Sequence, residues 1–237
     1  MEDMDMSPLL IAGILTAVDS IIDSDDDYDM SRETFRFLHG LVANNLKKKE
    51  NLRQSGRSTI STEKQLLLTL WTFATPDSYR SVCDRFNVGE ATAIRAVRRV
   101  TLSILKLRNQ FIKWPSDEEV PLINGDFEES ANIPKVLGAI GGTHIKILAS
   151  KENAESYINR KSFHSIQLQV VCDNTRKFLH CFTGYRGSVN DQRVFKVSGM
   201  QELCNKAECF PGKCHLIGDA AYVNQKHLLT PYRDNGH

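Results

Sequence analysis

Two aspartates in the second half of the chain stand where a metal-dependent enzyme places its ligands. Asp219 directly follows a short apolar segment, residues 215–218, and Asp191 follows a Gly-Ser loop at the expected start of a helix. Carboxylates in such places bind divalent ions that activate a water or hydroxyl and stabilise the leaving oxygen of a phosphodiester. Mg²⁺ prefers hard oxygen ligands of this kind. Aspartates also cap helices and close turns, so both interpretations stay open on spacing alone.

The cysteines offer a second candidate site. Cys204, Cys209 and the pair Cys214-His215 are five residues apart in each case. Structural zinc sites generally have two to four residues between the members of a ligand pair, so we expect ordinary buried or loop thiols here. Six cysteines in 237 residues are too few for a disulfide scaffold. This count favours a reducing, intracellular compartment.

The formal net charge of +1 hides three unlike segments. Residues 1–30 form an acidic head with a charge of −9, residues 31–115 carry +10, and residues 116–237 sum to zero. A basic segment of this size suggests a polyanionic partner, although a solvated basic face explains it equally well. No stretch has the roughly 18 consecutive apolar residues of a membrane span, so we expect no membrane partner. The acidic start also argues against a secretory signal.

Apolar residues at helical spacing predict an all-helical domain over residues 31–115. We expect Ser31 and Ser61 to cap two helices, because a serine at this position accepts an N–H of the first turn. A short helix from Ser78, a turn at residues 87–89 and a longer helix over about residues 90–108 follow, with Ile94 facing inward. This order is typical of a helix-turn-helix.

A helix-turn-helix would place residues 90–99 in the major groove of DNA. Arginines occur there at positions 95, 98 and 99. Thr92, Ala93, Arg95 and Arg99 would then face bases or phosphates, and Arg98 belongs to the same basic cluster. An ordinary helical bundle with a basic outer face gives the same pattern, so the sequence leaves both open.

The second domain, residues 116–237, is expected to contain strands. Residues 117–119 begin a polar connector, and residues 136–148 are apolar and β-rich. Residues 166–172 alternate apolar side chains with Gln167 and Gln169, which predicts a half-buried strand, and residues 177–183 return as its hairpin partner. A loop at 184–188, a short helix from Asn190 and a strand at 215–218 follow. Three antiparallel strands, a helix and another strand suit a mixed α/β fold of the ribonuclease H type.

Several stretches closely resemble the PIF/Harbinger transposases and the DDE nuclease-like proteins derived from them. The resemblance covers roughly residues 30–237, in order. It is carried by residues 61–66, 77–82, 111–115, 138–145, 155–161, 163–167, 187–195, 218–222 and 229–237. The resemblance implies an α+β protein, in which a helical, helix-turn-helix-like DNA-binding part precedes a ribonuclease H-like DDE core. It also implies a divalent cation (Mg²⁺ or Mn²⁺), DNA as the substrate, a Myb/SANT-like partner protein and a nuclear location, with the cytoplasm left open.

This chain departs from the family's catalytic pattern. The first aspartate of the family directly precedes Gly-Thr-His in the first strand, where this chain has Gly141. Asp191 and Asp219 match the family's further aspartates, so the resemblance gives them catalytic and metal-binding roles. The last acid of the family, a glutamate on a later helix, has no counterpart before His237. We therefore expect a core that lacks this helix and that either self-associates or needs a partner to cover its exposed apolar surface.

Two functions remain open on the sequence. One is a metal-dependent DDE endonuclease, which the resemblance supports. The other is a domesticated DNA-binding or protein-interaction module that kept the fold and lost catalysis, which Gly141 supports. A phosphodiester enzyme that loses one metal-bridging carboxylate loses most of its rate. The sequence therefore predicts a nuclease-family protein that is inactive as it stands.

Overall fold

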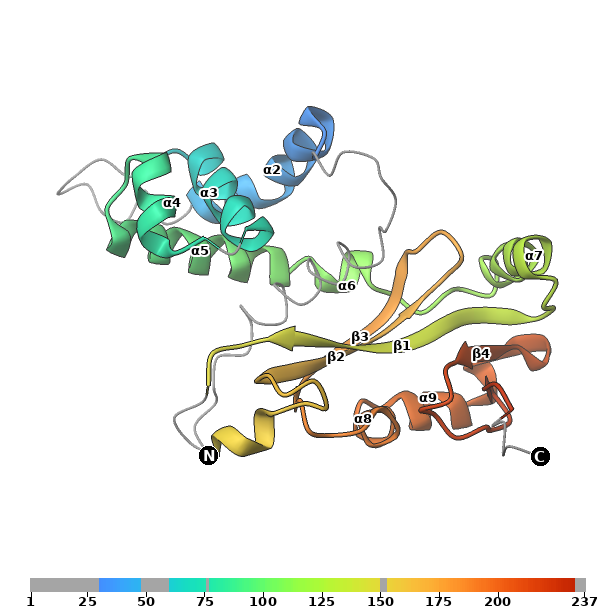
Figure 1. Ribbon diagram of the computed structural model, residues 1–237. Helices are drawn as coiled ribbons and strands as arrows, with labels where there is room; N and C mark the ends of the chain where they lie inside the picture. Colours follow the sequence, from blue (N-terminus) through green and yellow to red (C-terminus); the bar gives the residue numbers. More distant parts are fainter. Residues whose placement is uncertain (1–29, 48–59, 76, 150–152, 233–237) are drawn as a thin grey trace. The chain divides into compact units, whose positions relative to one another are not determined.

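The computed structural model describes residues 30–47, 60–75, 77–149 and 153–232. The chain forms two compact units, Met1–Arg108 and Asn109–His237 (Figure 1). The sequence-based boundary, between residues 115 and 116, falls inside the second unit. The acidic head, except for Met30, lies outside the described residues, and so do residues 48–59 of the basic segment 31–115. No helix in the part of the chain that is described is long and apolar enough to cross a membrane.

Four helices make up the described part of the first unit: α2 (Arg32–Lys47), α3 (Thr62–Ala74), α4 (Tyr79–Phe86) and α5 (Glu90–Leu105). The predicted serine caps are present. Ser31 Oγ accepts the Thr34 N–H at 3.0 Å, and Ser61 Oγ accepts the Lys64 N–H at 3.2 Å. These bonds satisfy N–H groups that a helix leaves unpaired in its first turn.

Helix α5 packs through small side chains, and this corrects two predictions. Ala93 and Ala96 are fully buried against α3 and α4, whereas Ile94 is 44% exposed. Small residues let helix backbones approach closely, so the buried stripe passes through the alanines and turns Ile94 outward. Ala93 therefore cannot face DNA. The predicted helix over residues 90–108 ends at Leu105, and a separate short helix, α6 (Arg108–Phe111), follows it.

The second unit is built on one five-stranded sheet in the order β3-β2-β1-β4-β5. Its strands are β1 (Val136–Lys146), β2 (Ser165–Cys172), β3 (Phe178–Arg186), β4 (His215–Gly218) and β5 (Leu228–Leu229). β1, β2 and β3 are antiparallel, whereas β4 and β5 continue parallel to β1. This is the strand order of a ribonuclease H-like core. The predicted fold class, a helical part followed by a mixed α/β core, is confirmed.

Helices cover the sheet of the second unit from two sides (Figure 1). On one side, α8 (Asp191–Val197) and α9 (Met200–Asn205) pack on the sheet through Phe195 and Met200, both fully buried. On the other side, α7 (Val120–Ala131) packs through Ile123 and Phe127 against the start of β1 and β4. The described loops of the same unit contain three short 3₁₀ helices, at Ala154–Tyr157, Ala207–Cys209 and Pro211–Lys213.

Three sequence-based predictions for this unit are wrong. The polar connector at residues 117–119 leads directly into α7. Strand β3 continues to Arg186, where a loop was expected, because residues 185 and 186 pair with β2 beyond a bulge. Strand β2 is buried on both faces, since Gln167 and Gln169 are only 2% and 1% exposed. Its glutamines therefore lie inside the protein rather than on a solvent-exposed face.

Candidate functional site

Asp191 and Asp219 occupy the ends of elements, as the sequence predicts. Asp191 is the first residue of α8, and the cap is Asn190, whose side chain accepts the Arg193 N–H at 2.8 Å. Asp219 directly follows β4 and is exposed. Its Oδ1 accepts the Ala221 N–H at 2.9 Å, and its carbonyl oxygen accepts the Tyr222 N–H at 3.2 Å. Asp219 thus closes a turn at the carboxyl end of β4.

Gly141 lies beside Asp219 at the edge between two parallel strands. Ile140 on β1 is in register with Gly218 on β4, so the next residues along the two strands are Gly141 and Asp219. A Cβ added at Gly141 would meet no heavy atom within 4 Å. The backbone therefore leaves room for a side chain at the position where the family has its first aspartate.

Asp191 lies against the other face of β1. A Cβ added at Gly142 would come 2.5 Å from Asp191 Oδ1 and 3.1 Å from its Cγ. Successive residues of a strand point to opposite faces of the sheet. A carboxylate at position 141 would therefore point away from Asp191. The structure brings together Gly141 and Asp219 on one hand, and Gly142 and Asp191 on the other.

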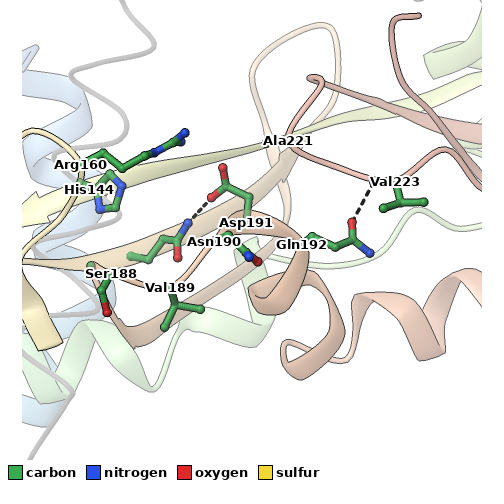
Figure 2. Close-up of a pocket in the computed structure, with 11 residues that line it drawn as sticks. His144, Arg160, Ser188, Val189, Asn190, Asp191, Gln192, Ala221 and Val223 are labelled. Atoms are coloured by element: carbon green, nitrogen blue, oxygen red, sulfur yellow. Dashed lines mark hydrogen bonds between the residues drawn. The ribbon is translucent and has the colours of Figure 1, made fainter. Parts of the chain in front are cut away.

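Asp191 lines a polar pocket with a volume of about 360 Å³ (Figure 2). The pocket is formed by β1, β2, the segment before α8 and the turn after β4. Figure 2 shows Arg160 extending over His144 toward Asp191. The lining residues are His144, Arg160, Gln167, Gly187, Ser188, Val189, Asn190, Asp191, Gln192, Ala221 and Val223. Asp219 does not belong to this lining.

A chain of hydrogen bonds leads from the loop before β2 to His144. Asn159 Nδ2 donates to Ser165 Oγ at 3.0 Å, and Ser165 Oγ is 3.1 Å from His144 Nδ1. Asn159 Oδ1 accepts the backbone N–H of Lys161 at 2.9 Å, which fixes the orientation of the amide. The imidazole is thus held at the wall of the pocket.

Asp191 is held by its neighbours on β2 and β1. Gln167 Nε2 donates a hydrogen bond to Asp191 Oδ1. Burial raises the pKa of Asp191, and so does the nearby charge of Asp219, while His144 and Arg160 oppose this shift. Burial lowers the pKa of His144, against the attraction of Asp191. The site therefore combines a carboxylate that binds its proton more readily with an imidazole that stays neutral more readily.

The acids present do not assemble the ligand set of a divalent ion. Among the described residues, no group of three or more His, Cys, Asp or Glu side chains could hold a metal ion together. Asp191 and Asp219 have the right donor chemistry, because carboxylate oxygens suit Mg²⁺. However, Asp191 is hydrogen-bonded on one face of β1 and Asp219 is engaged in a turn at its edge. The metal-binding role of the two aspartates stays a prediction.

The predicted DNA-binding residues lie along α5 in the first unit. Arg95 and Arg98 are exposed, whereas Thr92 and Arg99 are half-buried. Arg99 Nε donates to the carbonyl oxygen of Arg95 at 3.2 Å, one helical turn away. Thr92, Arg95 and Arg99 recur at intervals of three and four residues, so they lie on one side of the helix. The turn before α5 uses Asn87 in a left-handed conformation, with φ 46°.

The three cysteines of the candidate zinc set, Cys204, Cys209 and Cys214, belong to the second unit. Cys204 and Cys214 are buried, and no disulfide joins the six cysteines. Burial raises the pKa of Cys204 to about 12. Asn124 Nδ2 donates to Cys214 Sγ at 3.2 Å. These contacts describe thiols within the hydrophobic core.

Comparison with known protein families supports the resemblance seen in the sequence. Residues 140–237 match the family model described as DDE superfamily endonuclease. This chain carries a DDE superfamily endonuclease domain. The domain begins in β1, one residue before Gly141, and covers both Asp191 and Asp219. The predicted membership in the Harbinger transposase-derived group is also confirmed by the relatives described next.

Curated relatives come from plants and animals. The chain is 27% identical to the protein Antagonist of Like Heterochromatin Protein 1 of Arabidopsis thaliana, over 91% of this chain and 59% of the relative. It is 30% identical to the rat protein named "Putative nuclease HARBI1" and 29% identical to its human counterpart, over 88% of this chain and 60% of each relative. The chain thus spans about 60% of the length of these relatives. No solved structure matches it significantly.

Several residues of the pocket were not among the sequence-based candidates. Arg160 lies in a stretch that carries the family resemblance, but nothing in its type marked it as part of a site. The alternating pattern of the strand predicts a solvent-exposed Gln167, whereas the side chain is buried in the structure. Ser165 and Asn159 lie outside the lining of the pocket and reach it only through their hydrogen bonds toward His144, which a sequence pattern does not reveal.

Proposed function

We propose that this chain is a transposase-derived DDE endonuclease-family protein that binds DNA and is impaired in cutting it. The observation that carries the proposal is Gly141 beside Asp219 at the β1–β4 edge. A side chain fits there, yet the chain supplies none. Two-metal phosphodiester cleavage needs carboxylates that converge on the ions, so the missing carboxylate removes a ligand from the reaction centre.

A nicking assay tests the impairment. Supercoiled plasmid is incubated with the full chain and Mg²⁺ or Mn²⁺, and the Asp219→Ala variant serves as the matched control. We expect no metal-dependent nicking above the level of this control. If the unmodified chain cuts DNA and the Asp219→Ala variant does not, the proposal is wrong and the protein is an active nuclease.

The Gly141→Asp variant tests the origin of the impairment. The open space at this position should accept the carboxylate beside Asp219, and two carboxylates with waters form an acceptable Mg²⁺ shell. We therefore expect tighter Mn²⁺ binding with little gain in nicking, because Asp191 lies against the other face of β1. Unchanged Mn²⁺ affinity shows that position 141 is not next to a metal-binding edge.

DNA binding is assigned to α5 in this proposal. Arg95 and Arg98 are exposed on a helix that follows a short helix and a tight turn. Removing one arginine that neutralises a phosphate should reduce the slope of log affinity against log salt by roughly 0.9. The double variant Arg95→Ala/Arg98→Ala should thus flatten the slope by about 2 in fluorescence anisotropy. Equal slopes for the variant and the unmodified chain, or salt-independent binding, reject this assignment.

The family also suggests a Myb/SANT-like partner and a nuclear location. Both belong to the proposal. Co-purification of the tagged full chain with a Myb/SANT-like protein, together with imaging of the tagged chain in cells, measures them. A tagged chain that is excluded from the nucleus, with and without the partner, rejects the location.

A further inference from the structure

Helix α5 presents a basic side to solvent in the described part of the first unit. Helices α2, α3 and α4 pack against its other side, through buried residues that include Ala93 and Val100 (Figure 1). Away from these contacts, Ile94, Arg95 and Arg98 are exposed. Side chains three and four positions apart are neighbours on a helix surface, so these three residues form one patch. We call Ile94, Arg95 and Arg98 the α5 patch.

The α5 patch lies in a stretch of the chain that has no acidic residue. Residues 91–108 contain five Arg and Lys side chains and no Asp or Glu. Helices α2, α3 and α4, in contrast, each contain at least one acid among their cations. The positive charge of the described part of this unit is therefore concentrated along α5, which favours an anionic partner there.

The first 29 residues of the same chain have the complementary composition. They lie outside the described residues, so only their sequence is compared with the patch. Residues 8–18 are predominantly apolar, and residues 19–29 contain six aspartates and no Lys or Arg. We call residues 19–29 the aspartate run. An apolar stretch that continues into the aspartate run matches a patch in which Ile94 lies beside two arginines.

The position of the aspartate run in the chain favours contact within one molecule. The run ends at Asp29, and α2, which packs on α5, begins at Arg32. Eleven extended residues span up to about 36 Å, whereas a helix of the length of α5 measures about 24 Å. A short tether of this kind gives an effective concentration of about millimolar, so even weak charge pairing is sufficient for binding.

We propose that the aspartate run docks on the α5 patch of the same chain and competes with other polyanions for it. The aspartates pair with Arg95 and Arg98, and the apolar residues that precede them cover Ile94. The docking itself does not depend on the proposed function, but the choice of DNA as the competing polyanion rests on it. If the run covers the patch for nine-tenths of the time, the affinity for the competitor falls about tenfold.

Carbodiimide cross-linking of the full chain tests the docking without DNA. The reagent joins carboxylates to lysine amines, so Arg95→Lys and Arg98→Lys each supply an amine at the patch and keep its charge. Arg80→Lys, on an exposed arginine of α4, is the matched control. Mass spectrometry then identifies the cross-linked positions.

The expected cross-links join the aspartate run to positions 95 and 98. At about 50 mM salt they should be about fivefold more abundant than cross-links to position 80 in the control, and about 1 M salt should abolish them. Equal abundance at all three positions overturns the proposal. Cross-links that join two chains, rather than two parts of one chain, overturn it as well, because they assign the patch to the head of a second copy.

Two variants with the same change in net charge test the competition. Asp26→Asn/Asp27→Asn removes two charges from the aspartate run, and Glu128→Gln/Glu129→Gln removes two exposed charges from α7. In fluorescence anisotropy at low salt, we expect the first variant to bind DNA about threefold more tightly than the unmodified chain, and the second to bind it equally. Equal gains show an effect of net charge alone and reject the competition, and so does the absence of a gain in the first variant.

The docking and the proposed function fail separately. If the cross-links form as expected but the chain does not bind DNA, the docking stands and the proposed DNA binding is wrong. If DNA binding depends on Arg95 and Arg98 but the cross-links are absent, the docking is wrong and the proposed function stands.

Discussion

Two neighbouring glycines of β1 should respond to the same substitution with opposite sign. A Cβ at Gly142 would come 2.5 Å from Asp191 Oδ1, whereas a Cβ at Gly141 meets nothing within 4 Å. Gly142→Ala must displace the Asp191 carboxylate and its hydrogen bond from Gln167, and overpacking of this kind costs about 1–3 kcal/mol. Gly141→Ala restricts the unfolded chain without a clash, which stabilises by about 0.4–1 kcal/mol. The two variants should thus differ by about 1.5–4 kcal/mol in the free energy of unfolding.

Urea denaturation followed by circular dichroism measures this difference. Both variants change the same residue type by one methyl group, so each controls for the intrinsic effect of alanine in a strand. The urea midpoint should rise for Gly141→Ala and fall for Gly142→Ala, with equal denaturant slopes. Equal midpoints, or the reverse order, would show that Asp191 does not lie against the face of β1 to which Gly142 belongs.

Three further predictions concern caps, charge and thiols. Ser61→Ala should destabilise the first unit by about 1 kcal/mol in urea denaturation, because the Lys64 N–H loses its acceptor; an unchanged midpoint contradicts the cap. The pKa of Asp191 in the native state is raised above its ordinary value of 3.8. At pH values between the unfolded-state and native-state pKa, the native state binds more protons than the unfolded state, so the free energy of unfolding falls as pH rises through this range. Asp191→Asn should remove this decline between pH 4 and neutral pH, and a persisting decline identifies another group. Burial raises the pKa of Cys204 to about 12, so mass spectrometry should find this thiol unlabelled by a thiol reagent at pH 8 until urea unfolds the chain; rapid native labelling rejects its burial.

Local signals in the sequence were enough to predict most elements of the fold. Ser31 and Ser61 are caps because the hydroxyl group of a serine directly before an apolar helical pattern can accept an unpaired N–H of the first helical turn. The start of α8 follows from Asn190 in the same way. The short apolar run at residues 215–218, which is followed by turn residues, predicts the strand before Asp219. In each case the residue and its partner are within a few positions of each other.

The errors arise where packing between distant segments decides the outcome. The alternation of Gln167 and Gln169 with apolar residues predicts one solvent-exposed face, but both faces of β2 are buried in the structure. Gln169 Nε2 donates to the hydroxyl of Tyr222 at 3.2 Å, and Ser198 Oγ donates to Gln169 Oε1 at 2.9 Å. These partners lie 53 and 29 residues away in the chain. Nothing in the local pattern distinguishes a buried, paired glutamine from an exposed one.

The candidate site shows the same division between local and distant information. Sequence motifs predict that Asp191 and Asp219 are functional, but they do not tell which face of β1 each one occupies. The strand pleat decides this, because Gly142 contacts Asp191 while Gly141 lies beside Asp219. The two aspartates are nevertheless coupled, because the charge of Asp219 raises the pKa of Asp191 and the turn that follows Asp219 lines the pocket of Asp191. Restoring a carboxylate at position 141 therefore adds a ligand beside Asp219, and its charge should raise the pKa of Asp191 further, as the charge of Asp219 already does.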